Sequence, residues 1–116
     1  MPKRRNDQAP LKPAAFHILL ALAGVERHGL GIADEIESIT AGAMQLGPGT
    51  LYRSLKELTA AGMIREVRPR NAVIDSRRRY YALTNPGRVG LEAGAVRYER
   101  LSRLARKRGV LPVQAP

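Results

Sequence analysis

Residues 46–55 read LGPGTLYRSL, and this stretch decides how the whole chain is interpreted. Pro48 suits the first turn of a helix, where a backbone N–H has no partner within the helix. Leucines recur at positions 51, 55 and 58, which is the spacing of one apolar face on a helix. Gly62 is typical of the position just beyond a helix end. The sequence therefore predicts a helix over residues 48–61 that buries its leucine face.

The opposite face of this predicted helix carries hydrogen-bond donors. It holds a hydroxyl, a phenol and two cationic groups, from Thr50, Tyr52, Arg53 and Lys56, beside Glu57. Such groups donate to DNA phosphates and to base edges in the major groove. We predict that Thr50, Tyr52, Arg53 and Lys56 contact DNA. The alternative for Tyr52 is a half-buried tyrosine of the core.

An apolar helix is predicted at the start of the folded region, over residues 11–23. Its stripe consists of Ala15, Ile18, Leu19 and Leu22, while Phe16 and Leu20 lie off that stripe. A helix that is apolar all round must be buried all round. In so small a domain, a second subunit would most simply cover the side that carries Phe16 and Leu20.

A second helix is predicted after a turn at residues 29–31, and Gly42 is expected to end it. Its apolar stripe is Ile32, Ile36 and Ile39. The acidic residues Asp34, Glu35 and Glu37 lie opposite that stripe. Acidic groups early in a helix suit the positive end of its dipole.

The periodicity changes after Gly62. Residues 63–68 and 78–83 alternate roughly between apolar and polar, and the polar loop 69–77 joins them, which predicts a β-hairpin with a long tip. The hairpin is cationic, with six arginines at positions 65, 68, 70, 77, 78 and 79. We predict that Arg70, Arg77, Arg78 and Arg79 contact DNA from this hairpin. Tyr80 and Tyr81 should point to opposite faces of the strand, one of them into the core.

A last helix is predicted from Thr84, a good N-cap, to about residue 108, with Pro86 in its first turn. One side of it carries Leu91, Tyr98, Leu101, Leu104 and Ala105. Gly90 and Gly94 lower its intrinsic stability by roughly 1 kcal/mol each relative to Ala, so packing must hold it.

Three helices followed by a hairpin are the order of a winged helix-turn-helix, in which the third helix enters the major groove. The predicted fold class is mainly α with a small β-hairpin, an α+β winged helix-turn-helix with a C-terminal dimerisation helix. The expected organisation is a flexible basic arm at 1–10, a DNA-binding domain at 11–83, the dimerisation helix at 84–109 and a tail at 110–116.

The amino-acid composition limits the kinds of protein to which this chain can belong. The chain has 116 residues, a net charge of +10 and no cysteine, so one domain without disulfides or thiolate metal sites is expected. No apolar run approaches the ~20 residues of a membrane span, and the expected location is the cytoplasm. A basic folded domain favours a polyanionic partner, with nucleic acid ahead of an acidic membrane surface. We expect no membrane partner.

Three blocks of the sequence closely resemble the PadR-type transcriptional regulators. They are LGPGTLYRSL at 46–55, the segments before it at 19–22 and 28–32, and the segment RRYYALTNPGR after it at 78–88. The resemblance covers residues 11–105 and implies a homodimeric repressor that binds palindromic promoter DNA, often with release by a small-molecule effector. It implies that the first and last helices form the dimer contact. The residues predicted there are Phe16, Leu20, Leu91, Tyr98, Leu101 and Leu104.

The sequence gives little support for a catalytic or metal-binding site. Neither His17 nor His28 has partners at ligand spacing, and a turn-stabilising or phosphate-contacting role suits His28 better. Residues 47–49 are glycine-rich but lack the Lys-Ser/Thr of a phosphate-binding loop. We predict no enzyme activity, no catalytic residues, no metal and no cofactor.

Three other functions stay open at this point. One is a non-specific architectural or RNA-binding protein, and another is a protein-interaction module for an acidic partner. The third, compatible with the main prediction, is a sensor with a small-molecule pocket between hairpin and last helix. The basic positions 97–108 of the last helix are interpreted mainly as a solvated face, with an auxiliary DNA surface as the alternative.

Overall fold

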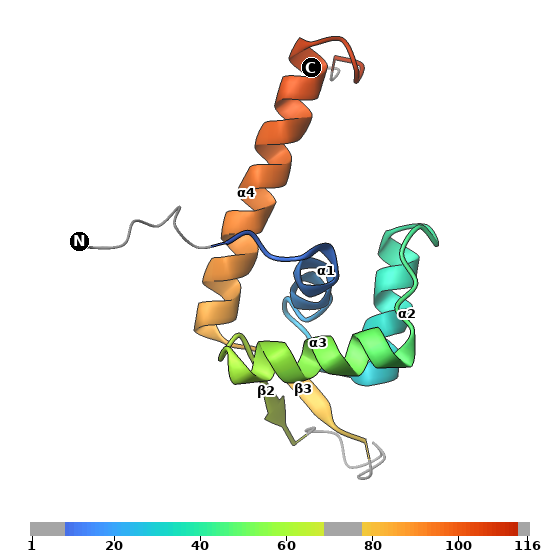
Figure 1. The fold of residues 1–116 in the computed structure, drawn as a ribbon, viewed down its shortest axis with the longest axis vertical. Coiled ribbons are helices and arrows are strands. Elements are labelled where there is room, and N and C mark those ends of the chain that lie inside the picture. The colour runs from blue at the N-terminus through green and yellow to red at the C-terminus, as the bar shows by residue number, and fades with distance from the viewer. Residues whose placement is uncertain (1–8, 69–77, 114–116) are drawn as a thin grey trace, which may run out of the picture.

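The predicted order of helices and strands is present in a computed structural model that describes residues 9–68 and 78–113. Within those ranges the elements are α1 (Pro13–Ala21), β1 (Arg27–His28), α2 (Gly29–Ile39), α3 (Pro48–Ala60), β2 (Ile64–Val67), β3 (Tyr80–Leu83) and α4 (Asn85–Lys107). The predicted fold class, α+β with a winged helix, is confirmed. Figure 1 shows a compact head of helices and strands from which α4 projects.

The small sheet has one strand more than the sequence predicted. Its order is β1-β3-β2 and both pairings are antiparallel, with Glu66 opposite Tyr81 and His28 opposite Tyr80. The two-residue strand β1 was missed because Arg27 and His28 carry no alternation that distinguishes a strand from a turn. Tyr81 is the buried member of the tyrosine pair, as one of the two was expected to be.

Helix α1 lies at the centre of the head and packs against α2, α3 and α4. The core consists of Phe16, Ile18, Leu19, Ala21, Leu22, Ile32, Ile36, Leu51, Leu55, Leu58, Ile64, Tyr81 and Leu91. The predicted stripe of α3 is thus buried throughout. Ile39 was wrongly assigned to the stripe of α2, because it is the last residue of that helix and its side chain is exposed.

The start of α2 differs from the prediction. Residues 29–31 form its first turn rather than a preceding turn, because His28 caps the helix: its Nδ1 accepts a hydrogen bond from the Gly31 N–H at 3.1 Å. This cap moves the acidic residues away from the helix start, and the first turn holds none. The predicted interaction of Asp34, Glu35 and Glu37 with the helix dipole is therefore wrong.

Helix α4 covers much of the second face of α1. Phe16 is only 8% exposed in the single chain, and its ring lies 4.7 Å from that of Tyr98 between centroids. The expectation that a second subunit covers this side is therefore not needed for Phe16, which α4 of the same chain covers. Leu20 remains exposed.

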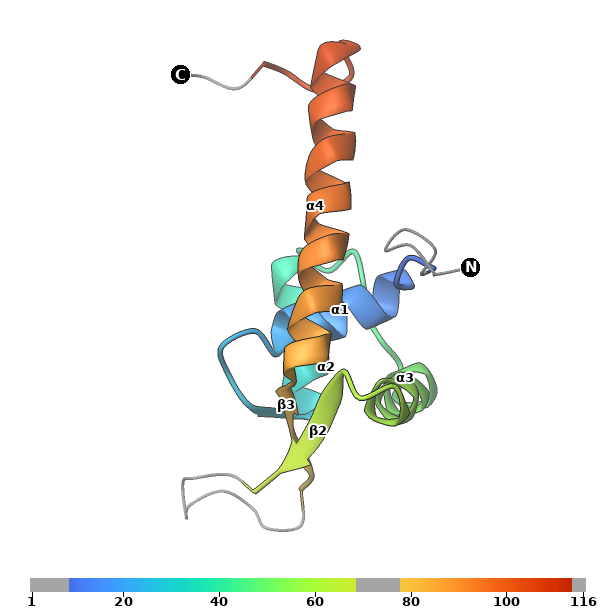
Figure 2. The ribbon, with the colours of Figure 1, turned by 90° about the vertical axis from the view of Figure 1, so that its left-hand side faces the viewer.

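The start of α4 is fixed to the head through Thr84. Its hydroxyl donates to the Gly62 carbonyl at 2.6 Å and accepts from the Gly87 N–H at 3.1 Å. Gly62 itself has a positive φ of 76° at the end of α3, as its position in the sequence predicted. Beyond the head, the distal half of α4 projects away from the sheet, as Figure 2 shows. No helix within residues 9–68 and 78–113 is both long and apolar enough to span a membrane.

Candidate nucleic-acid interface

Helix α3 separates its two faces cleanly. Leu51, Leu55 and Leu58 are buried. On the other side, the four predicted contact residues are all exposed: Thr50, Tyr52, Arg53 and Lys56. Tyr52 is 51% exposed and does not belong to the hydrophobic core, although its ring packs against Gly29. The helix thus presents donors to solvent along one continuous face.

Strands β2 and β3 lie at the end of the head opposite the projecting end of α4 (Figures 1 and 2). Arg78 and Arg79 precede β3 and are exposed. Arg79 forms a solvent-exposed ion pair with Glu66 of β2, at 3.4 Å. The predicted contact residues Arg70 and Arg77 lie outside the described residues.

An open groove lies between the start of α2, α3 and the residues before β3. It has a volume of about 290 Å³ and is lined by His28, Gly29, Leu30, Tyr52, Arg78 and Arg79. The Tyr52 ring lies against Gly29, where an added β-carbon would be 2.9 Å from the phenol oxygen. A larger residue at position 29 would require the Tyr52 ring to shift. Sequence reasoning did not find this groove, because its residues come from segments about 25 positions apart.

His28 is one of the residues that line this groove. Its Nε2 is 2.8 Å from Nη1 of Arg78, and its ring lies edge-on to Tyr80 with 5.3 Å between centroids. Partial burial lowers the pKa of His28 below its ordinary value, the Arg78 charge lowers it further, and Asp34 acts in the opposite direction. These effects favour the neutral form of the ring.

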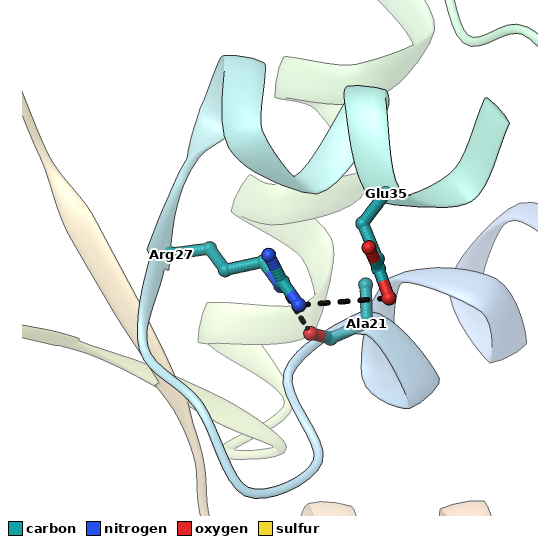
Figure 3. Close-up of polar contacts among 3 residues, drawn as sticks. All are labelled: Ala21, Arg27 and Glu35. Atoms are coloured by element: carbon teal, nitrogen blue, oxygen red, sulfur yellow. Dashed lines mark hydrogen bonds and ion pairs between the residues drawn. The ribbon is translucent and has the colours of Figure 1, made fainter. Parts of the chain in front are cut away.

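Arg27 holds the segment before His28 in place. Its Nε donates to the Ala21 carbonyl at the end of α1, at 2.7 Å, and its Nη2 lies 3.5 Å from Oε2 of Glu35 in α2. Figure 3 shows the guanidinium between the carbonyl and the carboxylate. A cation at a helix C-terminus supplies a donor to carbonyls that lack a partner within the helix. Arg27 thus links α1 to α2 and fixes β1, which carries His28.

The residues predicted for a dimer contact fall into two groups. Phe16 and Leu91 are each 8% exposed and belong to the core of one chain. Leu20, Tyr98, Leu101 and Leu104 are exposed, and Leu101 is the most exposed of them at 61%. Three of these four lie on the projecting half of α4.

Residues 18–93 match the sequence profile of the Transcriptional regulator PadR-like family. The chain belongs to this family. The match contains α2, α3, the sheet and the first part of α4, together with the C-terminal end of α1. PadR-like proteins are transcriptional regulators and not enzymes. Within the described ranges, no group of three or more His, Cys, Asp or Glu side chains could hold a metal ion.

Known proteins resemble this PadR-like chain in sequence and in fold. A Streptomyces fradiae protein described as an uncharacterized 37.1 kDa protein in transposon TN4556 is 36% identical over 99 residues, which are 85% of this chain and 25% of that protein. The chain therefore spans about a quarter of that relative's length.

Two solved structures illustrate the shared fold. A PadR-family regulator from Clostridium difficile has a TM-score of 0.67 at 22% identity, over 83% of this chain and 97% of that one. Bacillus subtilis PadR, solved in complex with operator DNA, has a TM-score of 0.60 at 23% identity, over 72% of this chain and 47% of that one. At 22% and 23% identity, the similarity to these two structures shows a shared fold.

Proposed function

We propose that this PadR-like regulator is a sequence-specific DNA-binding repressor that acts as a homodimer on inverted-repeat promoter DNA. Thr50, Tyr52, Arg53 and Lys56 of α3 enter the major groove. Arg70, Arg77, Arg78 and Arg79 contact DNA from the hairpin. In this proposal, residues 11–83 form the DNA-binding head, residues 84–109 the dimerisation helix, and the protein acts in the cytoplasm.

The observation that carries the proposal is the two-faced character of α3. Its three leucines are buried in the head, while Tyr52, Arg53 and Lys56 are exposed on the opposite side. A helix held rigidly by its apolar face can present its donors to base edges at fixed spacing. The net charge of +10 adds a sequence-independent attraction to phosphates.

The exposed apolar side chains of α4 support the dimer. Tyr98, Leu101 and Leu104 follow one another at intervals of three residues on the projecting half of the helix, and all three are exposed in one chain. Residues three apart on a helix are surface neighbours, so they form one apolar strip. A symmetric dimer through this strip would place two α3 helices on half-sites about one helical turn apart, roughly 34 Å.

Selection of bound DNA from a pool of random duplexes tests the proposal directly. We expect recovery of an inverted repeat, which would establish sequence preference and dimer symmetry together. Recovery of DNA without a shared motif would favour the non-specific architectural alternative. No duplex binding near physiological salt would favour the protein-interaction alternative.

The salt dependence of binding gives a second, quantitative test. If the dimer neutralises ~6–10 phosphates, its affinity should fall by about 10³–10⁵ between 50 and 200 mM salt. A much weaker dependence would contradict a binding mode based on the arginines of the hairpin. The control is the same titration with a single-stranded oligonucleotide of equal length.

Release by a small-molecule effector is the remaining part of the proposal. A ligand that binds the folded protein raises its melting temperature by mass action. Thermal shift against small aromatic and hydrophobic compounds, repeated with operator DNA present, would detect an effector whose binding opposes that of DNA. If no compound both stabilises the protein and displaces DNA, this part of the proposal fails.

A further inference from the structure

The ring nitrogens of His28 face two hydrogen-bond donors. The Gly31 N–H donates to Nδ1 at 3.1 Å, and the Arg78 guanidinium lies against Nε2, with Nη1 at 2.8 Å. A neutral imidazole has one acceptor nitrogen and one N–H. When Nδ1 accepts the bond that caps α2, the neutral ring carries its proton on Nε2. In that tautomer Nη1 of Arg78, which lies 2.8 Å from Nε2 and 3.5 Å from Nδ1, finds an N–H rather than an acceptor at Nε2.

The Nε2–H of His28 and the guanidinium of Arg78 then both need an acceptor from outside the pair. A guanidinium is always protonated and has no acceptor atom, so Arg78 cannot accept from His28. Protonating His28 would not help, because it would add a positive charge beside Arg78 and a proton on the nitrogen that caps α2. An anionic oxygen at the edge of the pair can accept from both N–H groups at once.

The surroundings of the pair favour an anion. Arg79 and the hydroxyl-bearing Tyr52 line the same groove, which opens to solvent beside the exposed face of α3. The carboxylate whose field reaches His28 is that of Asp34, and it is exposed on α2 rather than part of the groove lining. The groove therefore combines the phenol of Tyr52 with two arginines, of which Arg79 is already paired with Glu66 at 3.4 Å, and Arg78 is the cation nearest to His28.

We propose that His28 and Arg78 together bind a single backbone phosphate of the DNA duplex, with one phosphate oxygen accepting from His28 Nε2 and from the Arg78 guanidinium. This inference rests on the proposed function and adds to it a phosphate site built from the start of α2 and the start of β3. The phosphate fixes the register of α3, because Tyr52 of that helix forms a wall of the same groove.

The two side chains can be separated by substitution. R78Q removes the charge of Arg78. H28N removes the ring N–H but retains a capping oxygen, since Asn is among the best N-cap residues. R103Q is the matched control, because Arg103 on α4 is an exposed arginine of equal charge, paired with Glu99 at 3.2 Å. Melting temperatures of all variants, followed by circular dichroism, verify the fold.

The probe is a fluorescein-labelled 30-base-pair duplex, and binding is followed by anisotropy between 50 and 200 mM NaCl. We expect R78Q to reduce the slope of log K against log salt by about 0.9, which corresponds to one phosphate contact. We expect its affinity to fall about tenfold, as for loss of a charge-assisted hydrogen bond. R103Q should leave the slope unchanged.

The double variant H28N/R78Q identifies the shared phosphate. If both side chains bind the same oxygen, H28N should weaken binding severalfold in the wild type and have little further effect in R78Q. Fully additive losses, or a slope for R78Q equal to that of the wild type, would overturn the inference while leaving the proposed function intact. Absence of duplex binding by the wild type would instead refute the proposed function.

A second arm separates duplex phosphate from free phosphate. Inorganic phosphate is added at constant ionic strength, and the melting temperature is compared between wild type and R78Q. We expect no difference in shift at millimolar phosphate, because the site requires the rest of the duplex for affinity. A phosphate-dependent shift that R78Q abolishes, together with an unchanged DNA slope, would show a small-anion site and overturn the inference.

Discussion

The ring of Phe16 lies directly against the backbone of α4 at Gly94, so closely that a β-carbon on residue 94 would be 2.7 Å from Cδ1 of the ring. This contact joins the central helix of the head to the helix that projects from it. Gly94 weakens α4 intrinsically, but without a side chain it lets α1 and α4 approach. The alanine variant G94A therefore gains helix propensity and loses packing.

We expect G94A to be destabilised. Its methyl group would force Phe16 out of its position, and overpacking of a core typically costs 1–3 kcal/mol, more than the ~1 kcal/mol that Ala gains over Gly in a helix. The matched control is G90A, whose β-carbon would meet the flexible end of Met63 at 3.1 Å. Thermal unfolding should place G94A several degrees below the wild type and G90A at or above it. A G94A variant as stable as G90A would contradict this packing.

Two neighbouring positions of α3 should respond in opposite ways. Leu51 is buried and Arg53 exposed. L51A should lose about 2–5 kcal/mol of unfolding free energy, as expected for a large core side chain. R53A should unfold like the wild type and lose affinity for the selected DNA. Urea unfolding and anisotropy check the two effects. If R53A retained wild-type affinity and melting temperature, the assigned DNA-binding face would be wrong.

Much of this fold follows from local patterns. The spacing of the leucines in α3, Pro48 at the start of that helix and the cap that Thr84 forms on Gly87 are local features, so the sequence alone predicts them. The prediction failed where a distant segment decides the structure. Gly94 looks like a weak point until Phe16 is seen against it, and β1 exists only because Arg27 and His28 pair with β3.

The candidate interface also has one part that the sequence predicts and one part that it does not. The exposed face of α3 could be predicted because burial of Leu51 determines by helical geometry that Arg53 is exposed. The groove could not be predicted, since His28, Tyr52 and Arg78 meet only after the sheet has formed. The sequence did indicate either a turn-stabilising or a phosphate-contacting role for His28. The observed cap on Gly31 is the former, and our inference adds the latter.

Stability should fall as the pH falls through the range in which His28 titrates. The pKa of His28 in the folded chain lies below the ordinary 6.5, because of burial first and the Arg78 charge second, with Asp34 opposing. Below pH 6.5 the unfolded chain therefore binds more protons than the folded chain, and unfolding is favoured. The contribution of the neutral cap is complete above pH 6.5 and is lost as the pH falls through the folded pKa.

Urea unfolding at about pH 7.5, 6.5 and 5.5 measures this dependence. H28N is the control, because it keeps a cap that does not titrate in this range. We expect the stability of H28N to change less over this interval than that of the wild type. Equal changes in both proteins would assign the pH dependence to other groups.

Loss of Arg27 should loosen the connection between α1 and α2. R27A removes the donor to the Ala21 carbonyl and the partner of Glu35. Because the site is partly buried, we expect a loss of about 1–2 kcal/mol of unfolding free energy. E35Q removes only the weaker, longer ion pair and should lose well under 1 kcal/mol. If E35Q were as destabilised as R27A, the ion pair rather than the carbonyl contact would hold β1.

The apolar strip of α4 should determine the oligomeric state. Leu101 is 61% exposed in one chain, so a glutamate there leaves the head intact but introduces a charge into the proposed subunit contact. We expect wild-type protein to sediment as a dimer and L101E as a monomer with unchanged helix content. V89E is the control, because Val89 is also exposed on α4 but lies outside the strip. A monomeric L101E should also lose most of its affinity for an inverted repeat, since one head can occupy only one half-site. Dimeric L101E, or a monomeric wild type, would refute the proposed contact.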